Sequence, residues 1–244
     1  MGSPLRIAMW SGPRNISTAM LRAWGNRPDT AVCDEPFYAH YLEATGQDHP
    51  GREEIIACGE TDSRKVAAWL TGEVPGGRAI FYQKHMTHHL LPETERGWME
   101  AVTHAFLIRD PGEVIVSYLK KNHDPTVEDL GFAQQAKIFD QVCCRNPEPK
   151  PPIVDAADVL RSPEHMLRIL CEALGTVFDP AMLRWPPGPR DTDGVWAKHW
   201  YAEVERSTAF ASYHPKDEPV PARLRDVYKR CLEYYLRLHA QRLH

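Results

Sequence analysis

The sequence predicts an α/β protein built on a parallel sheet flanked by helices, and two observations support this fold class. Five short apolar runs have the length of buried strands. They lie at residues 7–10, 31–33, 79–82, 105–108 and 153–154. Segments with hydrophobic residues at helical spacing lie between these runs, and this alternation is typical of a parallel sheet covered on both faces. We therefore expect one domain over residues 1–244.

The first half of the chain gives clear turn and helix signals. Ser11-Gly12-Pro13 ends the first strand, and residues 16–24 are expected to be helical. The polar stretch 43–62 is expected to be loop or a short helix. Ser63 is a plausible N-cap for a helix through Leu70.

The second half continues the alternation. A helix is expected over 93–102, and Asp110-Pro111 has the residue types of an N-cap and first turn. Further helices are expected over 128–144, 163–174 and 220–243. Gly175 is expected to end the second of these three helices. Proline-rich or glycine-rich connections are expected over 147–152 and 185–194.

Composition limits the possible functions. The 244 residues include 29 Lys+Arg and 33 Asp+Glu, so the formal charge of −4 argues against nonspecific nucleic-acid binding. Any anion site must therefore be local. The six cysteines form no regular framework or metal-binding spacing, which favours reduced thiols and a cytoplasmic protein. No signal peptide or membrane-spanning run is apparent, so we expect no membrane partner.

Residues 10–18 join the first strand to the first helix and favour an anion. Gly12 lets the backbone approach a ligand, Arg14 adds a charged, forked donor, and the helix start offers free N–H groups. The candidate ligand-binding residues are Gly12, Pro13, Arg14, Asn15, Ile16, Ser17 and Thr18. An ordinary strand–loop–helix connection is the alternative. The Walker pattern needs Gly-Lys where Asn15-Ile16 stands, so the segment supports an ATP–Mg site only weakly.

Arg109 and Ser117 form a second candidate pair. Arg109 ends the fourth strand, and Ser117 lies about two turns into the next helix. A guanidinium and a hydroxyl placed in this way could converge on one phosphate. Alternatively, Arg109 pairs with Asp110 or a helix carboxylate, and Ser117 faces solvent.

Together the two segments resemble the sulfotransferase superfamily. Residues 14–18 look like its 5′-phosphosulfate loop, and residues 107–118 look like its 3′-phosphate segment, with Arg109 and Ser117 at the family separation. The resemblance implies a P-loop-like fold and 3′-phosphoadenosine 5′-phosphosulfate (PAPS) as the donor, with 3′-phosphoadenosine 5′-phosphate as the product. It also implies transfer of a sulfuryl group to a hydroxyl or amine of a small-molecule acceptor, without a metal.

Sulfuryl transfer needs a base and a cation at the leaving group. Arg14 is the candidate cation. Lys84-His85 resembles the family's Lys-x-His, one residue short, which makes His85 a candidate base and His88 a second option. Glu35, followed by proline as in some carbohydrate-type members, is the other candidate, and burial would raise its pKa. The sequence leaves this choice open.

Residues 188–198 resemble, in outline, the loop that covers the nucleotide in many sulfotransferases. Trp196 could stack on adenine, and Arg190 or Lys198 could reach the 3′-phosphate. A surface loop with a buried tryptophan is the alternative. The acceptor walls are expected in 43–62 and 185–215.

Two other functions fit parts of the pattern. One is a P-loop kinase or phosphotransferase that uses ATP–Mg, with Asp110 near the metal; the other is a noncatalytic nucleotide-binding protein. The sequence leaves the acceptor and the oligomeric state open.

Overall fold

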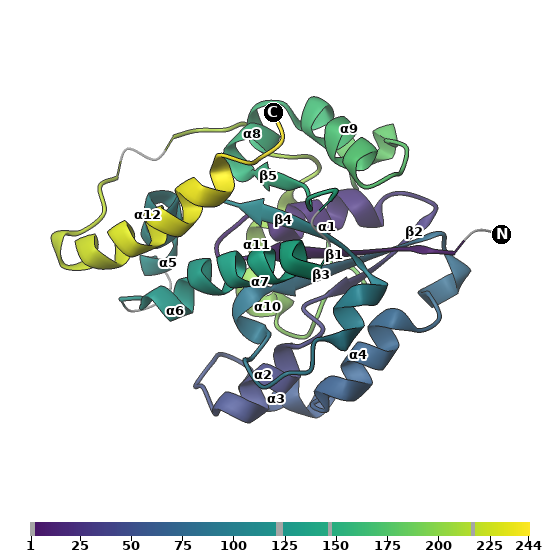
Figure 1. Ribbon diagram of the computed structural model, residues 1–244, viewed down its shortest axis with the longest axis horizontal. Coiled ribbons are helices and arrows are strands. Elements are labelled where there is room, and N and C mark those ends of the chain that lie inside the picture. Colours follow the sequence, from purple (N-terminus) through teal and green to yellow (C-terminus); the bar gives the residue numbers. More distant parts are fainter. Residues whose placement is uncertain (1–2, 121–123, 146–147, 216–217) are drawn as a thin grey trace.

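A parallel sheet with the strand order β2-β3-β1-β4-β5 forms the centre of the computed structural model (Figure 1). The structure describes residues 3–120, 124–145, 148–215 and 218–244. The strands are β1 (Leu5–Ser11), β2 (Thr30–Asp34), β3 (Ile80–Met86), β4 (Thr103–Ile108) and β5 (Ile153–Asp155). The expected α/β class, with one parallel sheet flanked by helices, is confirmed.

Helices cover both faces of the sheet. The longer ones are α1 (Ser17–Gly25), α2 (Tyr38–Thr45), α4 (Ser63–Thr71), α5 (Pro111–Leu119), α7 (Phe132–Arg145), α9 (Pro163–Ala173) and α12 (Arg225–His239). Shorter ones are α3 (Arg52–Cys58), α6 (Val127–Leu130), α8 (Ala156–Arg161), α10 (Ala197–Trp200) and α11 (Ala202–Arg206). In Figure 1, α7 lies near the viewer, and α12 packs beside it on the same side of the sheet.

Alternating side chains along β1 divide the core into two layers. Ala8 and Trp10 join the cluster packed against α4, α5, α6, α7 and α12. Ile7 and Met9 point the other way and join the cluster with α1, α8 and α9. This alternation follows from the two-residue period of a strand buried on both faces.

The five predicted strands are all present, but β3 continues through Met86 instead of ending near residue 82. All seven of its residues are buried, including the polar side chains that made this end look like a loop. The predicted cap at Asp110 is confirmed, because its Oδ1 accepts from the N–H groups of Gly112 and Glu113.

Several helix predictions were wrong in detail. Asp62, not Ser63, caps α4, since its Oδ1 accepts from Arg64 N at 2.9 Å. The helix predicted over 93–102 is only the 3₁₀ turn η3 (Gly97–Ala101), whereas the stretch 43–62 has loops and the short helix α3, as expected, after the end of α2. The predicted helix over 128–144 is divided into α6 and α7 by Gly131, which has a φ of 72°.

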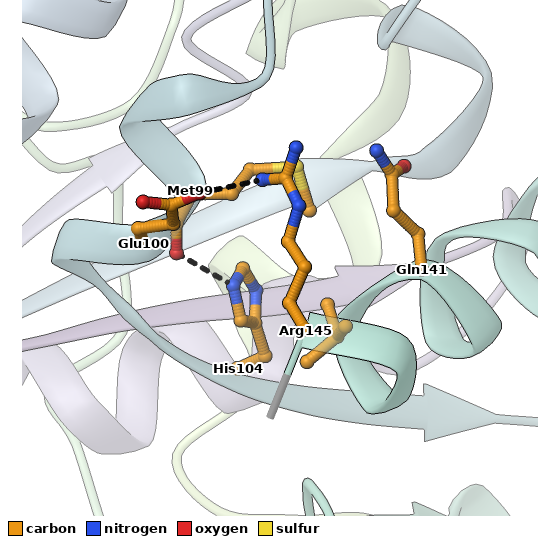
Figure 2. A pocket seen from close by; sticks show the side chains of 6 residues that line it. Met99, Glu100, His104, Gln141 and Arg145 are labelled. Carbon is orange, nitrogen blue, oxygen red and sulfur yellow. Dashed lines mark hydrogen bonds and ion pairs between the residues drawn. The ribbon is translucent and has the colours of Figure 1, made fainter. Parts of the chain in front are cut away.

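A buried histidine joins β4 to the chain before it. Trp10 Nε1 donates to His104 Nδ1 at 3.0 Å, so Nδ1 is an acceptor and the single ring proton of His104 is on Nε2. Nε2 donates to Met99 O at 2.9 Å. Burial lowers the pKa of His104 to about 4, and the ring is neutral. Figure 2 shows the small pocket that His104 and Arg145 help to line. It lies at the amino end of β4, whereas Arg109 follows the carboxyl end.

We expect Gly131→Ala to destabilise the protein by about 2–4 kcal/mol, because it combines a positive φ with crowding. A Cβ at this position would lie 2.6 Å from Thr87 Oγ1. Gly175 is the matched control, since its φ is also 72° but a Cβ there would meet nothing within 4 Å. Gly175→Ala should cost about 1 kcal/mol. Urea unfolding measures both, and equal losses would contradict the role of the Thr87 contact.

Candidate active site

The candidate residues lie along one edge of the sheet, at the carboxyl ends of four neighbouring strands. In spatial order, Glu35 follows β2, Lys84 lies near the end of β3, Arg14 follows β1 and Arg109 follows β4. The chain adds β2 and β3 on one side of β1 and then β4 on the other. Ligands in α/β sheets bind at such a switch point.

The two predicted anion-binding segments meet at this switch point. Arg14 Nε donates to Ser117 Oγ at 3.1 Å, and Arg109 Nη1 donates to the backbone oxygen of Arg14 at 2.9 Å. The strand-end arginine and the helix hydroxyl therefore both contact Arg14. They share one site instead of facing separate surfaces.

Asn15 and Gly12 fix the loop after β1 against its neighbours. Asn15 Nδ2 donates to Leu107 O at 3.0 Å, and Asn15 Oδ1 accepts from the Ile16 N–H at 2.8 Å. Asn15 therefore ties the loop to β4 where a Walker sequence would have other residues. A Cβ on Gly12 would lie 2.8 Å from Leu130 O, so glycine is needed there for packing against the end of α6. Ser17 is buried at the start of α1.

The arginine charges are balanced unequally. Glu113 accepts from Arg109 Nη2 at 2.8 Å and also from Tyr213 OH at 2.8 Å. Arg14, by contrast, pairs with no carboxylate within ion-pairing distance among the described residues. Burial lowers the pKa of Arg14, Glu203 opposes this effect, and Arg109 adds to it. The site thus presents a partly buried guanidinium to which an anion would be complementary.

Backbone strain marks the same residues. Arg14 has a φ of 56° and Glu35 a φ of 43°, and no other non-glycine residue of the described ranges has a positive φ. Each follows a strand, and each was predicted from the sequence as a site residue. Such strained positions cluster at functional sites because the surrounding contacts must hold them.

Glu35 belongs to a buried ionic cluster. Lys84 Nζ donates to Asp34 Oδ1 at 2.8 Å, Glu35 Oε1 at 2.7 Å and Tyr201 OH at 2.7 Å. Tyr201 OH in turn donates to Asp34 Oδ2 at 2.6 Å. Glu35 is largely buried, with 12% of its side chain exposed, whereas Lys84 is 2% exposed.

The cluster shifts the proton equilibria of its members. Burial raises the pKa of Glu35, Lys84 lowers it, and Asp34 raises it again, with an upward net direction. Burial alone would lower the pKa of Lys84, but the two carboxylates raise it well above its usual value. Lys84 is therefore charged, and Glu35 holds a proton more tightly than an exposed glutamate.

The structure separates His85 from this cluster. His85 lies inside β3, so its side chain points away from that of Lys84 and into the other core layer. Its ring stacks on Trp10 with the centroids 4.5 Å apart, and its Nε2 contacts Gln83 Oε1 at 3.2 Å. Burial lowers the pKa of His85 to about 3, so the imidazole is neutral.

His89 lies near Glu35, and His88 lies beside His89. His89 Nδ1 is 3.9 Å from Glu35 Oε2, and its ring stacks on Tyr38 at 4.5 Å. His88 contacts His89 and Tyr41 edge to face, and burial lowers its pKa to about 4. The sequence pointed to His88, but the histidine beside the carboxylate is His89.

The residues expected to cover a nucleotide have other partners. Arg190 Nη2 donates to Pro186 O at 2.9 Å, and Lys198 pairs with Glu54 on α3. Trp196 packs edge to face on Tyr38, with ring centroids 5.0 Å apart, and its Nε1 donates to Tyr201 OH at 3.3 Å. Trp196 therefore lies beside the Glu35 cluster.

A buried ion pair that the sequence did not indicate holds this segment. Arg22 on α1 donates to both carboxylate oxygens of Asp193 at 2.6 and 2.7 Å, and the side chains are 2% and 5% exposed. Sequence reasoning also missed Asp34, Lys84 and Tyr201 as one cluster. Adjacent acidic residues at a strand end were the only local signal.

The described residues form neither a metal site nor a membrane-spanning helix. Within the described ranges, no group of three or more His, Cys, Asp or Glu side chains is arranged to hold a metal ion. In the same part of the chain, no helix combines the length and apolar character needed to cross a bilayer. The six cysteines are all free.

A parallel sheet with arginines at its switch point is typical of α/β proteins that bind an anionic ligand at the carboxyl ends of their strands. Residues 5–242 match the family model described as "Sulfotransferase domain". The chain belongs to this sulfotransferase family.

Solved structures share the fold. The sulfotransferase domain from the curacin biosynthetic pathway aligns with a TM-score of 0.57 and 16% identity, covering 96% of this chain and 99% of that one. The sulfotransferase from Alicyclobacillus acidocaldarius aligns with a TM-score of 0.58 and 12% identity, covering 100% and 98%.

Two Arabidopsis thaliana proteins are similar in sequence. Branched-chain-amino-acid aminotransferase-like protein 1 is 35% identical over 99% of this chain, and branched-chain-amino-acid aminotransferase-like protein 2 is 34% identical over 96%. The matches cover 43% and 41% of those proteins, so the chain spans less than half of their length.

We expect Asp193→Asn to destabilise the protein by about 3–5 kcal/mol, because it leaves the buried Arg22 without its carboxylate. The control is Glu164→Gln, which removes an equally short pair with Arg168 whose side chains are both 55% exposed. That change should cost at most about 1 kcal/mol. Urea unfolding compares them, and similar losses would show that the Arg22 pair contributes no more than a surface pair.

Proposed function

We propose that this chain transfers a sulfuryl group from PAPS to a hydroxyl, or an amine, of a small-molecule acceptor. The observation that carries the proposal is the convergence of Arg14, Arg109 and Ser117 at the start of α1. Two guanidinium groups and a helix N-terminus suit a donor with phosphate at both ends. Membership of the sulfotransferase family supports the same reaction.

Each element of the donor site has a separate task. Arg14 and the start of α1 bind the 5′ end and neutralise the leaving phosphate, and Ser117 orients the Arg14 guanidinium. Arg109 binds the 3′-phosphate while Glu113 holds its guanidinium fixed. PAPS, when bound, supplies the activated sulfuryl group.

We assign the base to Glu35. It follows β2, two strands away from β1, and its raised pKa favours proton capture from an acceptor. Its free oxygen faces His89, beside Tyr38 and Trp196, which form the acceptor side of the site. As the acceptor oxygen bonds to sulfur, the bond between sulfur and the 5′-phosphate oxygen breaks, and 3′-phosphoadenosine 5′-phosphate leaves with its new charge beside Arg14. The proton of the acceptor hydroxyl moves to Glu35 Oε2.

Arg109→Ala should weaken binding of 3′-phosphoadenosine 5′-phosphate about 10- to 150-fold, because a charged hydrogen-bond partner worth about 1.5–3 kcal/mol is lost. Binding of adenosine 5′-phosphate, which lacks the 3′-phosphate, should change far less. Titration calorimetry measures both ligands. Arg145→Ala is the control, since it removes an arginine from α7 at the pocket in Figure 2, and it should affect neither ligand.

Equal losses for the two nucleotides would refute the assignment of Arg109. Thermal shift of the wild-type protein distinguishes the two possible donor classes, PAPS and ATP–Mg. A ligand at 100 times its Kd adds about 2.7 kcal/mol of stability. Greater stabilisation by ATP–Mg than by 3′-phosphoadenosine 5′-phosphate would favour a phosphotransferase instead.

Glu35→Gln should lower kcat about 10²- to 10⁴-fold, because the amide cannot accept the proton. In the wild type, kcat/KM should fall at acidic pH because Glu35 becomes protonated. The midpoint of this fall should lie above 4.5, the ordinary pKa of glutamate. Transfer of labelled sulfate at saturating donor measures both effects. His85→Phe keeps an aromatic ring against Trp10 and should retain turnover. Loss of kcat in His85→Phe, with Glu35→Gln active, would reverse the assignment.

A further inference from the structure

Lys84 has no hydrogen-bonding capacity left over. An ammonium group has three N–H donors. In this cluster they are directed at Asp34 Oδ1, Glu35 Oε1 and Tyr201 OH, all at 2.7–2.8 Å. Any change in one of these three contacts must therefore alter how strongly Lys84 binds the other two.

The cluster is also unbalanced in charge. One ammonium faces two carboxylates, so the group carries one excess negative charge when both acids are ionised. Asp34 accepts hydrogen bonds from both Lys84 and Tyr201, whereas Glu35 accepts one from Lys84 alone within this cluster. Because hydrogen bonds stabilise the ionised form of a carboxylate, the proton that relieves the imbalance goes most readily to Glu35, the acid that faces the acceptor side.

The Tyr201 hydroxyl lies between Lys84 and Asp34. Its hydroxyl accepts from Lys84 and donates to Asp34 Oδ2, and only 5% of the residue is exposed. The donated hydrogen bond disperses the negative charge of Asp34. Asp34 then competes less strongly with Glu35 for the shared ammonium.

We propose that Tyr201 and Asp34 are positioning residues that set the proton affinity of Glu35. They do so by determining how strongly the Lys84 ammonium binds each of the two carboxylates, Asp34 and Glu35. The inference rests on the proposed function in that Glu35 acts as the base. Asp34 keeps Glu35 basic enough to take a proton, and Tyr201 limits this effect so that Glu35 can still ionise.

Other titratable groups also face Glu35. His89 lies 3.9 Å away, and Tyr38 stacks on His89. Burial lowers the pKa of His89 well below its usual range and raises that of Tyr38, so both are neutral. The charges that act on Glu35 from within this cluster are those of Lys84 and Asp34.

The test measures the protonation of Glu35 directly in the full chain. Carbon-13 NMR follows the labelled glutamate carboxyl groups against pH, and Glu35→Gln identifies the signal of Glu35. Tyr201→Phe should move its midpoint upward by about one pH unit, because Asp34 then draws Lys84 more strongly. Asp34→Asn should move it downward by a similar amount, because a neighbouring negative charge is lost.

Tyr235→Phe is the matched control. Tyr235 OH donates to Asp155 Oδ2 at 3.0 Å, so this change also removes a buried tyrosine–aspartate hydrogen bond, but on α12 and β5. It should leave the midpoint of Glu35 unchanged. If Tyr201 had a purely structural role, Tyr201→Phe would lower stability, as Tyr235→Phe does. The Glu35 midpoint would then not shift in opposite directions in Tyr201→Phe and Asp34→Asn.

The inference is overturned if the Glu35 midpoint stays fixed in folded Tyr201→Phe, or if Tyr201→Phe and Asp34→Asn shift it in the same direction. Should Tyr201→Phe fail to fold, Asp34→Asn alone decides, since an unshifted or raised midpoint refutes the proposal. The acidic limb of kcat/KM should follow the same shifts. Absence of sulfate transfer by the wild type would instead refute the proposed function, independently of the titration.

Discussion

Burial of the Lys84 ammonium is the constraint on which the site depends. Removing such a charge from water costs several kcal/mol unless partners compensate it. The partners come from the end of β2 and from the segment that follows Trp196, so both segments must pack over β3. The same requirement fixes the position of Glu35 and gives a carboxylate of raised pKa at the edge of the sheet.

The donor side is organised differently. Ser117 holds Arg14, and Glu113 and the backbone oxygen of Arg14 hold Arg109. Within the part of the chain that the structure describes, no carboxylate forms an ion pair with Arg14. A cluster of fixed positive charge suits a multiply charged ligand because its orientation is set before binding. At this edge of the sheet, the arginines follow the neighbouring strands β1 and β4, whereas the two carboxylates lie at the end of β2. The strand order therefore separates a cationic half of the edge from an anionic half.

Much of the fold follows from local sequence patterns, because the strands are largely apolar and some helices, such as α5 and α8, begin at a capping aspartate. The juxtaposition of Arg14, Arg109 and Ser117 was predictable, since parallel strands place their carboxyl ends together. The end of β3 was not, because Gln83, Lys84 and His85 look like loop residues and are buried only through distant partners. Tyr201 was out of reach for the same reason, being 117 residues from Lys84.

The spacing of these partners along the chain has a consequence for biogenesis. Every contact described among Arg14, Arg109 and Ser117 lies within the first half of the sequence, whereas the Lys84 cluster needs Tyr201. During synthesis, at roughly 5–20 residues per second, Ser117 would emerge from the ribosome about eighty residues before Tyr201. In a nascent chain, the three residues proposed to bind the donor would therefore be available several seconds before the tyrosine that completes the Lys84 cluster.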